Sequence, residues 1–309
     1  MARKEKVFRV RRNKIKKTPG ERIFNVFNIL LMLIMCFIMV YPFWYCLIRS
    51  FNDGLDATRG NIWFWPRKFT IDNYVKLLSY RILLTSYRVT IARTVIGSLL
   101  SLVVTGLCAY AMTKKQLPGR NVIITIFMIP MFIGGTAVSN YIVMSRLHML
   151  DTFWIYIIPG CFGFFNMIIM RTYFYGIPTS LEESAKIDGA GYMRIFFRLI
   201  VPLSMPVIAC ILLFNAVGNW LDFYTNLLYV KNNKQLYVAQ YVLYLIINAN
   251  QPATMKEGGQ APEMKSTANV TPEVLKMAIL MFITAPILFL YPFLQKYFVQ
   301  GVLIGAVKE

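Results

Sequence analysis

Apolar residues in this chain are gathered into runs long enough to cross a lipid bilayer. The first, residues 23–48, carries no charge. At about 1.5 Å per helical residue it extends roughly 39 Å, more than the roughly 30 Å hydrocarbon core. Further apolar runs follow at residues 89–112, 122–144, 153–170, 202–229 and 274–297. The pattern predicts an all-α membrane protein with six transmembrane helices.

The first run is predicted to be an uncleaved anchor. It ends in the aromatic group Tyr41-Pro42-Phe43-Trp44-Tyr45, which suits a membrane interface. A secretory signal would have a shorter apolar core followed by a small-residue cleavage site.

Helix-breaking residues interrupt three of the other runs. They are Pro130 and Gly134-Gly135 in the third, Pro159-Gly160 and Gly163 in the fourth, and Pro286 and Pro292 in the sixth. Membrane helices tolerate such residues where neighbouring helices or a water-filled path satisfy the freed backbone groups. They favour a bundle packed around a pathway, although prolines and glycines are common in membrane helices generally.

Composition and charge agree with a membrane location. The 309 residues are 57% hydrophobic and 15% aromatic, with a mean hydropathy of +0.53, which is too apolar for a soluble domain. The net charge of +19 is densest over residues 3–17, directly before the first apolar run. Without a glycine-aromatic or zinc-ligand pattern, this basic tail indicates anionic lipid head groups rather than nucleic acid.

The distribution of Lys and Arg predicts that both ends of the chain are cytoplasmic. Basic residues are denser in the segments that an inside amino terminus would place inside than in those it would place outside. Residues 1–22 supply most of this bias. The inner segments are residues 1–22, 113–120, 171–198 and 296–309, and the outer ones are 49–88, 146–152 and 231–276.

Residues 180–206 form the one charged, glycine-broken stretch between the apolar runs. Ser180 followed by Glu183 predicts a capping box at a helix start, with Glu182 and Glu183 at the positive end of the helix dipole. Gly189 and Gly191 suit the left-handed backbone that ends a helix. An apolar periodicity then resumes, and Pro202 and Pro206 open the next run. The stretch predicts two short helices joined by a glycine hinge, or an ordinary loop helix with chance caps.

This stretch resembles the EAA loop of binding-protein-dependent ABC importer permeases. The family pattern is Glu-Ala-Ala, three residues, Gly, nine residues, then Ile-x-Leu-Pro. Here Glu183-Ser184-Ala185 is followed by Gly189 and by residues 199–202, which end in Pro202. The differences, Ser184 for alanine and Leu199 and Val201 for isoleucine and leucine, are small or apolar exchanges.

The resemblance implies that this segment is a coupling helix, which sits in a groove of a cytoplasmic ATPase and transmits its closure to the membrane helices. The residues that it implies for ATPase coupling are Glu182, Glu183, Ser184, Ala185, Asp188, Gly189, Ala190 and Pro202.

Three further segments resemble carbohydrate importers of the maltose-permease-like group. They are residues 64–74, residues 109–120 and residues 219–223. The resemblance covers most of residues 23–300 and implies the type I importer fold, with the first helix around the outside of the other five. It also implies a second related permease, two cytoplasmic ABC ATPase subunits, an extracellular solute-binding protein, and a prokaryotic cell membrane.

The domain boundaries follow from these segments. We expect a basic cytoplasmic tail at residues 1–22, a permease domain at 23–300 and a second cytoplasmic tail at 301–309. Within the domain lie the coupling segment, 180–202, and a polar outer loop, 231–273. The length of this loop resembles permeases linked to complex glycans, and we hypothesise that it touches the binding protein or a large substrate. A merely tolerated insertion is the alternative.

Five polar residues inside the predicted spans are candidates for the substrate pathway. A polar side chain facing lipid is costly, so these should face other helices or a cavity. Asn215 and Asn219 are four residues apart, on one helical face, and are predicted to line the pathway. Hydrogen bonding between helices explains them equally well. The full set is Asn140, Asn166, Asn215, Asn219 and Asp222. Arg93 is expected to extend its charge to the membrane interface.

Catalytic residues are not expected in this chain. It has no Gly-x-x-x-x-Gly-Lys-Ser/Thr loop, so ATP and Mg²⁺ would be bound by the partner ATPase. His148 is the only histidine, which argues against a multi-histidine metal site and leaves no metal or other cofactor predicted. The five cysteines, Cys36, Cys46, Cys108, Cys161 and Cys210, show no paired spacing and are interpreted as packing residues.

The sequence therefore predicts a permease that moves a saccharide, of oligo- or polysaccharide origin, by alternating access driven by the ATPases. A permease for peptides, amino acids or polyamines is the nearest alternative, because the coupling segment is shared among such importers. An ion channel or receptor would not account for the spacing from Glu183 to Pro202. An intramembrane enzyme would need catalytic groups inside the spans. The predicted spans of this chain contain no histidine and no paired carboxylates.

Overall fold

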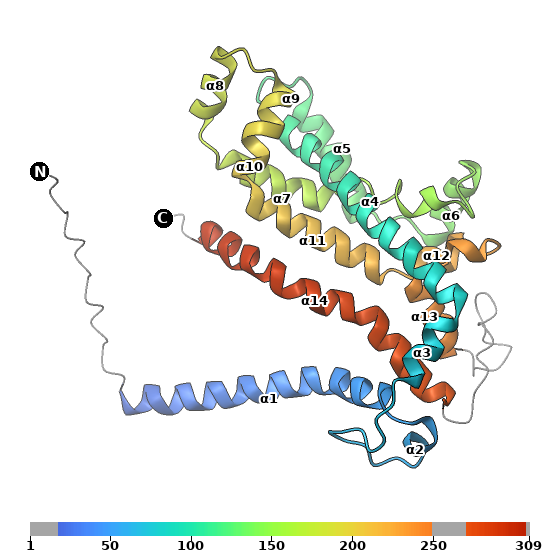
Figure 1. Ribbon diagram of the computed structural model, residues 1–309. Helices are drawn as coiled ribbons and strands as arrows, with labels where there is room; N and C mark the ends of the chain where they lie inside the picture. Colours follow the sequence, from blue (N-terminus) through green and yellow to red (C-terminus); the bar gives the residue numbers. More distant parts are fainter. Residues whose placement is uncertain (1–17, 249–269, 307–309) are drawn as a thin grey trace, which may run out of the picture.

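The fold is an all-helical bundle, seen here in a computed structural model that describes residues 18–248 and 270–306 (Figure 1). The described residues include an isolated bridge between Asn52 and Phe69. The α-helices are α1 (Pro19–Ser50), α2 (Gly54–Thr58), α3 (Asp72–Ser79), α4 (Arg81–Ala111), α5 (Arg120–Phe132), α6 (Ala137–Arg146), α7 (Phe164–Tyr175), α8 (Thr179–Ile187), α9 (Tyr192–Ile195), α10 (Val201–Leu203), α11 (Met205–Leu221), α12 (Tyr224–Tyr229), α13 (Ala239–Ile247) and α14 (Pro272–Ala306). Two 3-10 turns, η1 (Phe153–Tyr156) and η3 (Lys234–Leu236), and a π-helical turn, η2 (Phe196–Ile200), complete the set.

Helix α4 is the centre of the bundle and packs against α11 and α7. One face of α4 consists of buried glycine, serine and threonine residues at helical spacing, which let neighbouring backbones approach closely. Two hydroxyls on this face bond within their own helix: Ser86 Oγ donates to the Leu83 carbonyl and Thr90 Oγ1 to the Ser86 carbonyl, each at 2.9 Å. The buried small residues are Ser86, Thr90, Gly97, Ser98, Ser101, Thr105 and Gly106.

Two apolar clusters hold the two ends of the bundle together. One joins α3, α13, α14 and η1 through buried residues such as Leu77, Tyr241 and Ile279. The other joins α4, α7, η2 and α11 through residues such as Met170 and Phe196. The polar seam described below lies between them along α4 and α11.

Helix α1 stands away from the bundle and meets it through α14 (Figure 1). Its apolar side chains from Ile23 to Val40 are exposed. In the described part of the chain, α1, α4 and α14 are long and apolar enough to cross a membrane. Up to five crossings result if two bent helix pairs, α5 with α6 and residues 192–203 with α11, each count as one.

The predicted spans agree with the helices at three places and differ at the others. The first, second and sixth spans coincide with α1, α4 and α14. The third is broken by a 119° bend between α5 and α6, at Gly134-Gly135. The fourth is not one helix, since residues 157–163 are irregular between η1 and α7. Pro159 cannot donate a backbone hydrogen bond, and Gly160 and Gly163 give the backbone freedom to turn.

The fifth predicted span is also divided, because α11 ends at Leu221 and α12 begins at Tyr224. Part of the predicted polar loop 231–273 is instead the apolar helix α13, whose Tyr241 and Val242 are buried in the core. Its remaining turn-rich segment, residues 249–269, lies outside the described residues.

We predict that Gly106→Leu destabilises the bundle. A Cβ at this position would lie 3.2 Å from Met170 Cε and 3.3 Å from Phe196 Cζ, so the larger side chain overpacks the junction of α4, α7 and η2. The expected cost is about 1–3 kcal/mol, read as a lower unfolding temperature in detergent. Gly218→Leu is the matched control, because no atom lies within 4 Å of its Cβ position. Equal unfolding temperatures for the two variants would contradict the packing argument.

Candidate functional site

Helix α8 projects from one end of the bundle, beyond the end of α4 (Figure 1). It begins at Thr179, with Pro178 as its N-cap residue and no side chain capping it. The predicted capping box of Ser180 and Glu183 is therefore wrong. The helix starts one residue before Ser180, which places the Ser180 side chain inside the first turn instead of at the cap.

The predicted left-handed turn after this helix is confirmed at Gly189 and not at Gly191. Gly189 has a φ of +76°, the left-handed region that glycine adopts readily. Its N–H bonds the Lys186 carbonyl at 3.0 Å, and the Ala190 N–H bonds the Ala185 carbonyl at 2.9 Å. These two bonds form a Schellman motif, which ends the helix. Gly191 is extended, with φ −72°, and serves as the N-cap of α9.

One face of α8 is fastened to the end of α4. The Glu182 carboxylate pairs with the Lys114 ammonium and, at 3.1 Å, with that of Lys186. Lys114 Nζ also lies 3.9 Å from the centre of the Tyr110 ring. Burial by itself would raise the pKa of Glu182, but the hydrogen bonds and charges of the two lysines outweigh it and lower that pKa. The carboxylate is therefore ionised and paired at neutral pH.

The opposite face of α8 is open. Glu183, Ser184 and Asp188 are exposed, and the apolar side chain of Ile187 is 87% exposed. Glu183 and Ile187 are four residues apart and so lie on the same face. Neither the exposure of Ile187 nor the pairing of Lys114 with Glu182 was predicted from the sequence. The spacing from Glu183 could have indicated Ile187, whereas the pairing of Lys114 depends on a contact across 68 residues.

The path from α8 into the membrane helices includes an unusual turn. After α9 the chain forms the π-helical η2, directly before Pro202 in α10. A proline ring collides with the carbonyl four residues earlier in a regular helix, and the wider π turn relieves that collision. The chain then bends by 88° between residues 192–203 and α11.

Three of the predicted pathway residues meet in one polar seam between α4, α7 and α11. Asn166 Nδ2 donates to Asn215 Oδ1 at 3.0 Å, and Asn215 Nδ2 donates to Ser101 Oγ at 3.2 Å. One turn along α11, Asn219 Nδ2 donates to Ser98 Oγ at 3.2 Å. All three asparagines are half-buried, so each keeps an accessible side. Asn140 does not join them, since it is exposed on α6.

Asp222 lies at the end of the seam and pairs with Arg93, whose position differs from the predicted one. Arg93 does not reach to the membrane interface: it is buried, with 3% exposure. Its guanidinium pairs with the Asp222 carboxylate, donates to the Asp222 carbonyl at 2.9 Å and stacks 4.7 Å from the Tyr156 ring centre. A buried charge needs such partners, which the turn after α11 and η1 supply.

In the described residues, no group of three His, Cys, Asp or Glu side chains could hold a metal ion. The five cysteines are unpaired.

We predict that Glu182→Gln loosens α8 from α4. Losing one charge-assisted hydrogen bond, about 1.5 kcal/mol, should speed hydrogen exchange of the α8 amides about tenfold. Glu183→Gln is the matched control, since that exposed side chain forms no ion pair in the described structure. If the two variants exchange at the same rate, Glu182 does not hold the helix.

Comparison with known proteins gives consistent results. Residues 97–304 match the family "Binding-protein-dependent transport system inner membrane component". Protein LplC of Bacillus subtilis (strain 168) is 36% identical over 296 residues, covering 94% of this chain and 97% of that protein. The polygalacturonan/rhamnogalacturonan transport system permease protein YtcP of the same organism is 34% identical over 287 residues, covering 93% and 99%.

A solved structure is similar across nearly the whole chain. It is a chain from the crystal structure of a bacterial ABC transporter involved in the import of the acidic polysaccharide alginate, with a TM-score of 0.81 and 27% identity. The similarity covers 92% of this chain and 100% of that one.

Proposed function

This chain belongs to the family of binding-protein-dependent transport system inner membrane components, and on that premise we propose that it is the saccharide permease of an ATP-driven importer. The proposed substrate is an oligosaccharide or a fragment of a polysaccharide. It is supported by a relative named for polygalacturonan and rhamnogalacturonan transport and by the likeness to an alginate importer. These similarities favour saccharides over the peptides, amino acids or polyamines that the coupling segment alone would allow.

In this proposal the chain crosses the membrane six times, with both ends in the cytoplasm. The first turn of α1, the last turn of α14 and α8 all lie toward the left of the view in Figure 1, as one shared side requires. The density of Lys and Arg supports the same orientation. The bend between α5 and α6 and the irregular segment before α7 then lie within the third and fourth crossings.

The observation that carries the proposed mechanism is the two-faced character of α8. Its open face, with Glu183 and the 87% exposed Ile187, provides a surface for a cytoplasmic ATPase. Its inner face, through Glu182 and Lys114, holds the end of α4. When the two ATPases close on ATP and Mg²⁺, a push on α8 moves α4 through this ion pair and α11 through η2. The chain itself performs no catalysis.

The polar seam is the proposed substrate path. Carbohydrate hydroxyls need hydrogen-bond partners, and the half-buried amides of Asn215 and Asn219 face the interior of the bundle. Movement of α4 relative to α11 would break and remake the bonds to Ser101 and Ser98. A second, related permease would line the other side, and an extracellular binding protein would deliver the saccharide.

We predict that Gly189→Pro abolishes ATP-dependent saccharide uptake into proteoliposomes while the protein still inserts. Proline holds φ near −65° and cannot adopt the +76° that closes α8. Gly191→Ala, in the same segment, should transport normally because its φ of −72° suits any residue. Normal uptake in Gly189→Pro would refute the role of this hinge.

Glu183→Lys should also abolish uptake, because it reverses a charge on the open face of α8.

We predict that Asn215→Ala combined with Asn219→Ala lowers the apparent affinity for saccharide in the transport-coupled ATPase assay. The matched control is Ser98→Ala with Ser101→Ala, which removes the same two helix contacts from the α4 side. If the seam only packs helices together, the asparagine and serine double variants should lose equal thermal stability. Both should then keep the wild-type affinity for saccharide. That result would exclude Asn215 and Asn219 from the path.

A further inference from the structure

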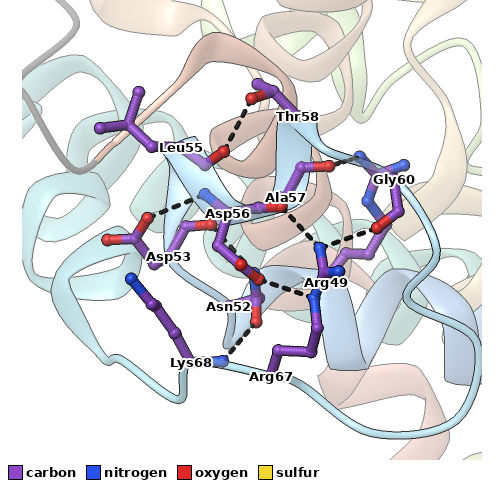
Figure 2. Close-up of polar contacts among 10 residues, drawn as sticks. All are labelled: Arg49, Asn52, Asp53, Leu55, Asp56, Ala57, Thr58, Gly60, Arg67 and Lys68. Atoms are coloured by element: carbon purple, nitrogen blue, oxygen red, sulfur yellow. Dashed lines mark hydrogen bonds and ion pairs between the residues drawn. The ribbon is translucent and has the colours of Figure 1, made fainter.

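A closed loop with an aromatic tip follows the outer end of α1. Figure 2 shows its base, where Arg67 donates to the Gly60 carbonyl at 2.8 Å and to the Asp56 carbonyl at 2.9 Å, and pairs with the Asp56 carboxylate at 3.1 Å. Gly60 and Asn61 both have left-handed backbones, with φ of 72° and 57°, which turn the chain sharply. Residues 61–66 are thus held as a projecting loop.

The base is also tied to its neighbours. Asn52 bonds the Asp56 carboxylate at 3.1 Å and accepts the Lys68 N–H at 2.9 Å. Arg49 of α1 donates to the Ala57 carbonyl at 3.2 Å and pairs with Glu273 of α14 at 3.1 Å. The loop therefore has a fixed position relative to the outer ends of α1 and α14.

The tip of the loop presents three aromatic side chains that the bundle does not cover. Ile62 is buried, but Trp63, Phe64 and Trp65 are 60%, 54% and 74% exposed. Three basic residues, Arg59, Arg67 and Lys68, are exposed beside them. Residues 57–71 contain no acidic residue. Exposed aromatics together with positive charge suit the head-group layer of an anionic membrane.

The contacts of the tip set its depth. The Phe64 ring lies 5.9 Å from that of Tyr41, the Trp65 ring lies 5.8 Å from that of Trp44, and Trp44 Nε1 donates to the Phe64 carbonyl at 3.1 Å. Tyr41 directly follows residues 23–40, an apolar helix length of about 27 Å, close to the roughly 30 Å hydrocarbon core. The loop thus reaches back along α1 to the boundary where the hydrocarbon ends.

We propose that Trp63, Phe64 and Trp65 insert into the outer leaflet and anchor the outer end of α1 in the lipid interface. Helix α1 meets the bundle through α14, so a lipid anchor beside Trp44 would hold its depth while the other helices move. The surface is continuous with the exposed apolar face of α1. The proposal requires that α1 cross the bilayer, and it is independent of which substrate is transported.

Tryptophan fluorescence tests the anchor in the full chain, assembled with its partners in vesicles of phosphatidylcholine and phosphatidylglycerol. The difference between the wild-type and Trp65→Phe signals isolates Trp65. We expect phosphatidylcholine brominated on its acyl chains close to the head group to quench this component strongly, with weaker quenching by lipid brominated near the methyl end and by aqueous acrylamide. Trp220→Phe is the control, because the buried Trp220 indole, bonded to the Ile283 carbonyl, should be shielded from acrylamide.

Quenching of the Trp65 component by acrylamide and not by brominated lipid would place the loop in water and overturn the proposal. Protection from both quenchers would place it under a protein partner, with the same consequence. Transport need not be measured, so failure of the anchor is distinguishable from failure of the proposed saccharide import.

Discussion

The close approach of α4 to α11 is the contact on which the rest of the described structure depends. Glycine, serine and threonine residues along α4 admit the neighbouring backbone, and a Cβ on Gly97 would lie only 3.1 Å from the Asn219 amide. The seam that results is polar, because Asn215 and Asn219 bond to Ser101 and Ser98. Close backbone approach and hydrogen bonds between helices are the interactions that hold membrane helices together.

The two ends of this helix pair carry different attachments. At one end Lys114, just beyond α4, holds α8 through Glu182, and η2 links the same segment to α11. Toward the other end Arg93 holds the turn after α11 through Asp222 and stacks on Tyr156 of η1. In the proposed mechanism a displacement of α8 would reach both helices of the seam, whereas the buried Arg93 pair would resist their separation near the opposite end. Such an arrangement suits the alternating access proposed above.

The backbone of residues 180–202 was predicted correctly only where local chemistry decides the outcome. Gly189 closes α8 in a left-handed conformation because the Schellman turn needs one there. Ser180 failed as a cap because the helix started one residue earlier, and several adjacent residues can begin a helix at little difference in free energy. The fourth span is not the single helix predicted, because the apolar content of residues 153–170 does not reveal that the backbone turns at Pro159 and Gly163. Helix α13 was missed because its apolar run is short and lies among polar residues.

Sequence alone was enough to predict the membrane location, the approximate positions of the long helices, and the short helix after Pro178 that ends at the left-handed Gly189. These depend on composition, periodicity and short spacing, which act within one turn or one span. Only the tertiary structure decided that Arg93 is buried against Asp222, that Glu182 faces Lys114 while Ile187 remains open, and that the loop carrying Trp65 folds back along α1. Each depends on a partner far away in the chain. A charged or aromatic residue has the same local pattern whether it meets lipid, water or that partner.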